Sequence, residues 1–314
     1  MRKENTGREF GQDIMRGEND RLSKSSKKFI KSTTFVKGIR EVSSLDDTYR
    51  KILKSGRKPD QEGGSDEIDD GSGTSIFDPV LCELSYRWFC PCGGHILDPF
   101  AGGSVRGIVA SVLGRKYTGI DLNPRQIAAN EDQAVSIIKD NGMRPRWIVG
   151  DSIRVRDLAP GAYDFVFSCP PYFDLEVYGN DPRDLSAMSH NEFLAAYREI
   201  ISASCSLLME NRFACFVVGD VRSSDGTYLN FVSETIGAFA NAGLSLYNEA
   251  ILVTALGSLP IRTSKQFVSG RKLGKTHQNV LVFVKGDWKK AVKECGEIDV
   301  EFGDPSEVAN EPGN

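Results

Sequence analysis

The stretch His-Ile-Leu-Asp-Pro-Phe-Ala-Gly-Gly-Ser, residues 95–104, decides the fold of this chain. Its apolar start, His95–Leu97, predicts a strand, and the two glycines that follow let the backbone approach a neighbour closely. Small apolar residues over Val105–Leu113 then predict a tightly packed helix. A strand, a glycine-rich turn and a helix in this order are typical of the opening unit of a doubly wound α/β sheet.

The same alternation continues along the chain. Further strands are predicted at Tyr117–Asp121, Trp147–Val149, Tyr163–Phe167 and Phe213–Val218. Helices are predicted from Pro124, capped by Asn123, to about Asp140, from the capping box of Ser189 and Glu192 to about Met209, and at about Leu229–Ala240. Leu246–Thr254 and Val280–Val284 look like two last strands with no helix between them. They predict an antiparallel pair at one edge of a mostly parallel sheet.

Composition limits the rest of the chain. Its 314 residues carry a formal net charge of -4, but residues 1–60 hold sixteen Lys/Arg against nine Asp/Glu. We predict a basic, partly disordered arm and acidic linker at 1–73, a folded domain at 74–286 and an acidic disordered tail at 287–314. No signal peptide or membrane span is expected, and the seven cysteines have no zinc-site spacing, so a cytoplasmic, metal-free protein is predicted.

Acidic residues follow three of the predicted strands. Ligands of doubly wound sheets bind outside the carboxyl ends of the strands, so these side chains are expected near one another. The glycine-rich turn that begins at Asp98 lacks the GxGxxG pattern. Its leading carboxylate suits the ammonium of S-adenosylmethionine better than it suits a phosphate. A dinucleotide-binding fold or a plain tight turn is the alternative. We predict S-adenosyl-L-methionine as the cofactor, with contacts from Asp98, Pro99, Phe100, Ala101, Gly102, Asp121 and Asp151.

A second distinctive segment, Ser168–Phe173, leaves the fourth predicted strand. An amino nitrogen on an aromatic ring is a weak nucleophile, and a site helps by accepting its N–H bonds and holding the ring in line with the methyl group. Two prolines make a stiff corner, and Tyr172 or Phe173 can stack on the ring. The segment predicts methyl transfer to an amino group, with Cys169, Pro170, Pro171 and Tyr172 as catalytic residues, against the alternative of a rigid turn with a core aromatic.

Residues 74–286 resemble the DNA amino-methyltransferases, which make N6-methyladenine or N4-methylcytosine. The resemblance rests on the DPFAGG turn, on the CPPY segment, on Thr74–Pro79, and on His277–Asn279 before the last strand. It implies a Rossmann-like S-adenosylmethionine-dependent methyltransferase fold with seven strands and an antiparallel edge pair. It also implies cofactor contacts from Phe77 and Ser168, double-stranded DNA as substrate and a flipped target base. CPPY and the residues after it resemble methylases of phages and mobile elements, which implies restriction–modification and a cognate nuclease as a partner.

The chain departs from the family pattern at Cys169, where the family has Asp, Asn or Ser. A thiol is a weak acceptor, so the Pro170 carbonyl, with Ser168 or Asp174 nearby, is expected to take the amino hydrogen bond instead. Attack by Cys169 on a pyrimidine ring, as in carbon-5 methylation, is disfavoured because that family places its cysteine after the proline.

No large target-recognition domain is left over, so DNA contacts are expected from 173–189 and 255–276. The second segment offers cations to phosphates, unless it is simply a solvated basic loop: Arg262, Lys265, Arg271, Lys272 and Lys275. Methylation of RNA or of a protein amide, and a catalytically weak DNA-binding module, remain alternatives. The target base stays open between adenine and cytosine.

Overall fold

The structure is a computed structural model that describes residues 48, 51, 77–138, 143–172, 181–223, 225–253 and 259–298, without the side chains of 259–262. One compact unit spans Thr48–Glu297, and it holds every element described below. Of the other unit, Met1–Asp47 with Ile298–Asn314, only Ile298 is described. The predicted arm at 1–73, apart from Thr48 and Lys51, therefore lies outside the described residues, as does the boundary at 74.

A seven-stranded sheet forms the centre of the described unit, in the order β3-β2-β1-β4-β5-β7-β6. Its strands are β1 (His95–Asp98), β2 (Lys116–Asp121), β3 (Arg146–Val149), β4 (Tyr163–Ser168), β5 (Leu208–Val218), β6 (Leu244–Val253) and β7 (His277–Lys285). The first five run parallel, whereas β7 is antiparallel to both β5 and β6. The predicted α/β class, the mostly parallel sheet and the antiparallel edge pair are confirmed.

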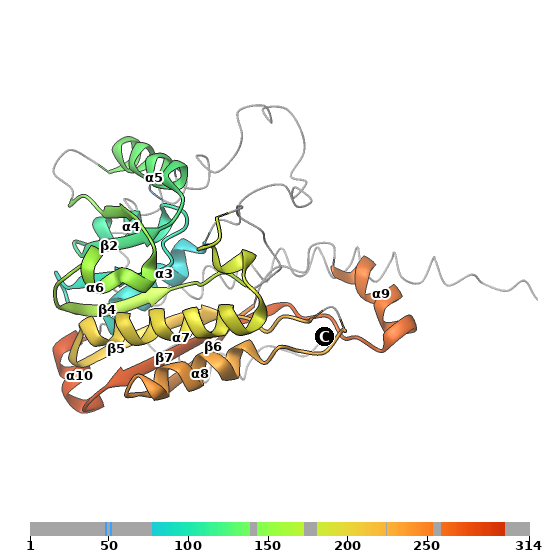
Figure 1. Ribbon diagram of the computed structural model, residues 1–314. Helices are drawn as coiled ribbons and strands as arrows, with labels where there is room; N and C mark the ends of the chain where they lie inside the picture. Colours follow the sequence, from blue (N-terminus) through green and yellow to red (C-terminus); the bar gives the residue numbers. More distant parts are fainter. Residues whose placement is uncertain are drawn as a thin grey trace, which may run out of the picture. The chain divides into compact units, whose positions relative to one another are not determined.

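Helices cover both faces of the sheet (Figure 1). Buried residues of α3 (Pro79–Phe89), α4 (Val105–Val112), α5 (Pro124–Ile137) and α10 (Trp288–Cys295) join one hydrophobic cluster. Those of α6 (Val155–Leu158), α7 (His190–Leu207) and α8 (Phe231–Asn241) join the other. Neighbouring β4 residues take opposite sides, with Phe165 and Phe167 in the first cluster and Val166 in the second. Because both faces are covered, the central strands read as almost continuous apolar runs.

Local chemistry explains where several elements begin. The side chain of Asn123 accepts hydrogen bonds from the backbone N–H groups of Arg125 and Gln126, and Pro124 occupies the first turn of α5, as predicted. The backbone N–H of Ser189 donates to Glu192 at 3.0 Å, so the predicted start of α7 is also confirmed. These caps fix the helices that follow β2 and precede β5.

Three parts of the sequence prediction are wrong. A helix, α9 (Leu259–Gly270), lies between β6 and β7, where none was expected. It stands apart from the labelled helices that cover the sheet (Figure 1) and is no crossover, since β6 and β7 still pair antiparallel. The predicted disordered tail contains α10, whose Ala291 is fully buried in the core, and β5 starts at Leu208, before the predicted end of α7.

The strands β1 and β4 are neighbours at the topological switch point, where the chain stops adding strands on one side of β1 and begins to add them on the other. From β1 the order runs outward to β2 and β3 on one side and to β4 and β5 on the other. Crevices in doubly wound sheets form beyond the carboxyl ends of the strands at such a switch point. Asp98 and Ser168 are the last residues of β1 and β4, so the fold brings the two distinctive segments together. None of the helices in the described part of the chain combines the length and the hydropathy that a membrane span requires.

Candidate active site

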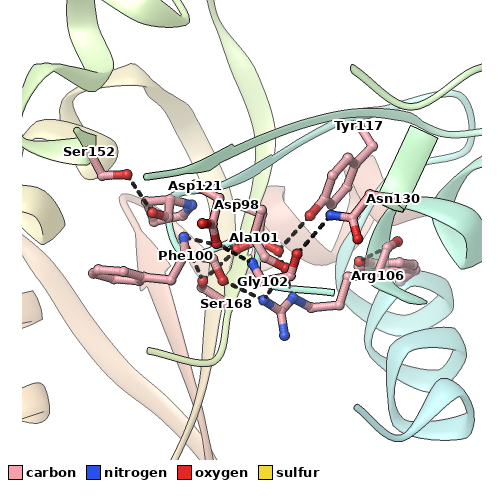
Figure 2. Close-up of polar contacts among 12 residues, drawn as sticks. Asp98, Phe100, Ala101, Gly102, Arg106, Tyr117, Asp121, Asn130, Ser152 and Ser168 are labelled. Carbon is pink, nitrogen blue, oxygen red and sulfur yellow. Dashed lines mark hydrogen bonds and ion pairs between the residues drawn. The ribbon is translucent and has the colours of Figure 1, made fainter. Parts of the chain in front are cut away.

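The carboxylate of Asp98 holds together the turn Asp98–Ser104, which we call the cofactor turn (Figure 2). Its Oδ1 accepts hydrogen bonds from the Phe100 backbone N–H at 3.1 Å and from the Ser168 hydroxyl at 2.5 Å. Its Oδ2 accepts from Arg106 Nε at 2.6 Å and from the Tyr117 hydroxyl at 2.7 Å. Asp98 is fully buried and both oxygens are engaged. The expectation that this carboxylate meets an ammonium directly does not fit this geometry, and Asp98 shapes the turn instead.

Arg106, on α4, is the counter-charge of Asp98 and was not predicted from the sequence. Its Nη2 also donates to the carbonyls of Phe100 at 2.5 Å and Ala101 at 2.9 Å, and its guanidinium lies 4.8 Å from the centre of the Phe77 ring. Burial alone would lower the pKa of Arg106, but the charge and hydrogen bond of Asp98, together with Tyr117 and Cys169, outweigh burial and raise the pKa. The sequence did contain a signal for this residue, because Arg106 is the one charged residue among the small and apolar residues of α4.

Three strand-end loops are tied to one another around the cofactor turn (Figure 2). The backbone N–H of Gly102 donates to Asp121 Oδ2 at 2.9 Å, and the Asn130 amide donates to the Gly102 carbonyl at 2.7 Å. The Ser152 hydroxyl donates to the Pro99 carbonyl at 2.5 Å. Gly102 has a φ of 49°, a conformation that favours glycine. The loops after β1, β2 and β3 therefore form one preorganised cradle.

Two carboxylates of this cradle remain partly exposed, in contrast to Asp98. Asp121 accepts from the backbone N–H groups of Gly102 and Asn123 but stays half-buried. Burial raises the pKa of Asp121, while those N–H groups oppose the shift. Asp151 is also half-buried and caps the short helix at Ser152–Arg154. A carboxylate has about four lone-pair sites, more than these backbone N–H groups occupy, so both side chains can accept further hydrogen bonds from a ligand.

Ser168 joins the two distinctive segments of the sequence. Its hydroxyl donates to Asp98, 70 residues earlier, and accepts from the Phe100 backbone N–H at 3.2 Å. β1 and β4 pair in parallel, with Leu97 opposite Val166. The cofactor turn and Ser168, the first residue of the segment Ser168–Phe173, are therefore in direct contact.

The segment Cys169–Tyr172 follows directly and crosses the switch point. Cys169 packs against the cluster on the α3 face, whereas Tyr172 packs against the cluster on the α7 face. Pro170 is buried, and its neighbours in the segment are half-buried. The Tyr172 ring makes an edge contact with Phe231, at 6.5 Å between ring centres, and burial raises the pKa of its hydroxyl.

A cavity of about 180 Å³ lies beside Tyr172, between the ends of β5 and β7. Its lining joins residues that are 106 positions apart in the chain: Tyr172, Gly219, Asp220, Val221, Lys275, His277 and Gln278. Apart from Tyr172 and Lys275, these residues were not predicted to belong to the site. The pair Gly219-Asp220, immediately after β5, was an available signal, since it follows a strand in the same way as Asp98, Asp121 and Asp151.

The predicted DNA contacts fall partly within the described residues. Lys265 and Arg271 are exposed on and after α9, Lys272 is half-buried beside Gly226, and Lys275 lines the cavity. The side chain of Arg262 and residues 173–180 and 254–258 lie outside the described part. Within that part, no cluster of three or more His, Cys, Asp or Glu residues could hold a metal ion.

No protein-family model and no curated protein sequence matches this chain. Among solved structures, it is similar to TrmN from Thermus thermophilus, with 14% identity, a TM-score of 0.44, and coverage of 66% of this chain and 48% of TrmN. A TehB-like SAM-dependent methyltransferase from Corynebacterium glutamicum has 18% identity and a TM-score of 0.40, covering 68% of this chain and 90% of that one. Magnesium protoporphyrin IX methyltransferase from Synechocystis, with bound SAM, has 13% identity and a TM-score of 0.44, covering 83% and 97%. The chain thus spans about half the length of TrmN.

Proposed function

We propose that this protein is an S-adenosylmethionine-dependent methyltransferase that modifies an exocyclic amino group of a DNA base, N6 of adenine or N4 of cytosine. One observation carries the proposal. The Ser168 hydroxyl contacts Asp98 at 2.5 Å, which puts the segment Cys169–Tyr172 beside the cofactor turn at the switch point of the sheet. A methyl donor held on one side and an amino-bearing ring held on the other would therefore meet at this point.

The cradle suits S-adenosylmethionine by the chemistry of its donors and acceptors. Asp121 and Asp151 are the half-buried carboxylates at successive strand ends, and they suit ribose hydroxyls and an adenine amino group. A Cβ built on Gly103 would meet nothing within 4 Å, so the turn borders open space. Phe77, held against Arg106, adds an aromatic side chain. When bound there, S-adenosylmethionine supplies a methyl group activated by a sulfonium.

The segment after Ser168 supplies the groups that hold the target ring. Tyr172 forms one wall of the cavity and offers an aromatic surface to a flat ring. Pro170 and Pro171 fix the corner and have no N–H groups that would compete with an amino group for acceptors. We assign the Pro170 carbonyl as an acceptor for the amino hydrogens, with Asp220 as a further carboxylate in the cavity lining. The rate advantage comes mainly from positioning.

The DNA substrate is supported by the resemblance and by charge near the cavity. Lys275 lies in its lining, and Lys265 and Arg271 extend the positive charge along α9 and the residues after it. Lysine and arginine side chains bind phosphates without reading sequence, and a base must leave the helix before its amino group can enter a cavity. The basic segment formed by α9 and the residues up to Lys275 would thus position the duplex while the cavity takes the extruded base.

The experiment is methyl transfer from labelled S-adenosylmethionine to matched amounts of duplex DNA, single-stranded DNA, RNA and a mixed protein substrate. We expect label in duplex DNA, recovered after digestion as N6-methyladenine or N4-methylcytosine. Label in RNA or protein would favour the alternative methyltransferases. Tight cofactor and DNA binding without transfer would favour the catalytically weak DNA-binding module. A further outcome, label on carbon 5 of cytosine, would place the chemistry on Cys169 and overturn the amino-group assignment.

A further inference from the structure

The hydroxyl of Tyr172 is tied to a residue on a distant strand. Gln278, on β7, donates a hydrogen bond from its side-chain amide to this hydroxyl. Tyr172 follows β4, and β5 lies between β4 and β7 in the sheet. The tyrosine side chain therefore reaches across the end of β5, and both partners of the contact belong to the cavity lining.

The surroundings of Tyr172 restrict its ring from other directions. Gly219, at the end of β5, lies against it, and a Cβ built on Gly219 would stand 3.6 Å from Tyr172 Cε1. Phe231 meets the ring edge to face, with an interplanar angle of 73°. The hydroxyl also has Cys169, earlier in the same segment, as a hydrogen-bond partner. The hydroxyl thus has two partners, a thiol of its own segment and an amide of β7.

We propose that Gln278 is a positioning residue that fixes the Tyr172 ring as the wall of the cavity, so that the target ring is held in line for transfer. This inference rests on the proposed function of the site. A phenylalanine at position 172 would offer the same ring surface but could not accept the amide hydrogen. In this chain the hydroxyl matters because it sets the orientation of the ring rather than because it reacts.

The arrangement also gives Cys169 a role that its weak acceptor chemistry allows. A thiol accepts a hydrogen bond poorly from a substrate amino group, but it can accept one from a fixed neighbouring hydroxyl. Gln278 and Cys169 then both bind the hydroxyl of Tyr172. The substrate amino group is left to the Pro170 carbonyl.

A double-mutant cycle tests the inference, with Gln278→Leu, Tyr172→Phe and the double variant of the full-length protein. A hydrogen bond of about 1 kcal/mol corresponds to about a fivefold change, so each single variant should lower kcat about fivefold. The double variant should lower kcat no further than either single one, and the KM for S-adenosylmethionine should stay unchanged in all three. Tyr247→Phe is the matched control, since the ring of Tyr247 packs on Phe213 and Trp288. This variant should leave kcat and KM unchanged.

The same proteins are compared by urea unfolding, a readout that needs no activity. Non-additive losses of unfolding free energy establish the Gln278–Tyr172 contact, and additive losses overturn it. Coupling in stability with unchanged kcat would show a merely structural contact and would also overturn the inference. If wild-type protein transfers no methyl group to any nucleic acid, the proposed function fails instead, and the stability cycle still reports on the contact.

Discussion

The candidate site has two halves, the cofactor turn and the cavity beside Tyr172. They differ in how much of each is filled by contacts within the protein itself. In the cofactor turn, both oxygens of Asp98 have protein partners and the side chain is fully buried. On the target side, Tyr172 borders an open cavity of about 180 Å³. Under the proposed function, the first half is prepared before any ligand arrives, because a methyl donor would have to be held in a fixed place. The second half would leave room for a ring that comes from outside.

This contrast predicts that damage to the cofactor turn first costs stability. Arg106→Met leaves Asp98 buried without its counter-charge, and breaking a buried ion pair in this way costs about 3–5 kcal/mol. Urea unfolding measures the loss. Arg154→Met is the matched control, because its pair with Asp157 has side chains 66% and 67% exposed, and such surface pairs contribute about 0–1 kcal/mol. Equal losses in the two variants would contradict the role of Arg106 in the turn.

Damage to the target side should instead lower methyl transfer while leaving cofactor binding unchanged. Tyr172→Ala removes the wall of the cavity, and misplacing a reacting group lowers the rate on the order of a hundredfold. S-adenosylmethionine affinity, measured by calorimetry, should match wild type, because the cradle does not include Tyr172. A large loss of cofactor affinity in this variant would show that the two halves are not separate.

Asp121 sharpens the comparison, because it belongs to the cradle yet remains half-buried. Asp121→Asn removes a charged acceptor, and losing a charged hydrogen bond of about 1.5–3 kcal/mol weakens S-adenosylmethionine binding by at least about tenfold. Since burial raises the pKa of Asp121 in the folded protein, this carboxyl stabilises the fold below its unfolded pKa, and that contribution is lost as the pH rises through the folded pKa.

Stability at neutral pH should therefore fall little in Asp121→Asn, although the side chain is partly buried. Cofactor affinity of the wild-type protein should decrease as the pH is lowered toward the raised pKa of Asp121, whereas the variant should lack this dependence. Titration calorimetry over a pH series measures the affinities, and urea unfolding at neutral pH measures the stability. An identical pH profile in the two proteins would remove Asp121 from the residues that bind the cofactor.

The smallest expected effect belongs to the basic segment formed by α9 and the residues up to Lys275. Replacing Lys265 and Arg271 by alanine should weaken DNA binding to all sequences alike and reduce the salt dependence, by a slope of about 0.9 for each phosphate that is no longer bound. S-adenosylmethionine binding should not change. Lys289→Ala, on α10, is the control cation and should leave the slope unaltered. An unchanged slope in the double variant would mean that these two cations are solvated and do not bind phosphates.

The half of the site that depends on local pattern could be predicted from the sequence. Asp98, Asp121 and Asp151 could be found because each follows an apolar strand, and parallel strands end on the same side of a sheet. Arg106 was missed because the local sequence around an arginine in an apolar helix does not indicate which residue it pairs with. Only the fold shows that the partner is Asp98, eight residues earlier.

The cavity was harder to predict because its walls come from three separate strand ends. Gln278 and Tyr172 are 106 residues apart, and nothing in either local sequence indicates the contact. The helix α9 was also missed, because its exposed polar and basic residues look like a solvated loop. The failure at the cavity concerns tertiary structure, whereas the local caps at Asn123 and Ser189 were predicted correctly.

The central claim is that a methyl group passes between the two halves of the site onto an amino nitrogen of DNA. Its most direct test is mass spectrometry of nucleosides from duplex DNA incubated with the protein and S-adenosylmethionine carrying a deuterated methyl group. We predict a deuterated N6-methyladenine or N4-methylcytosine, present with wild type and strongly reduced with Tyr172→Ala. Deuterium only in other nucleosides, or equal amounts with the two proteins, would contradict the claim.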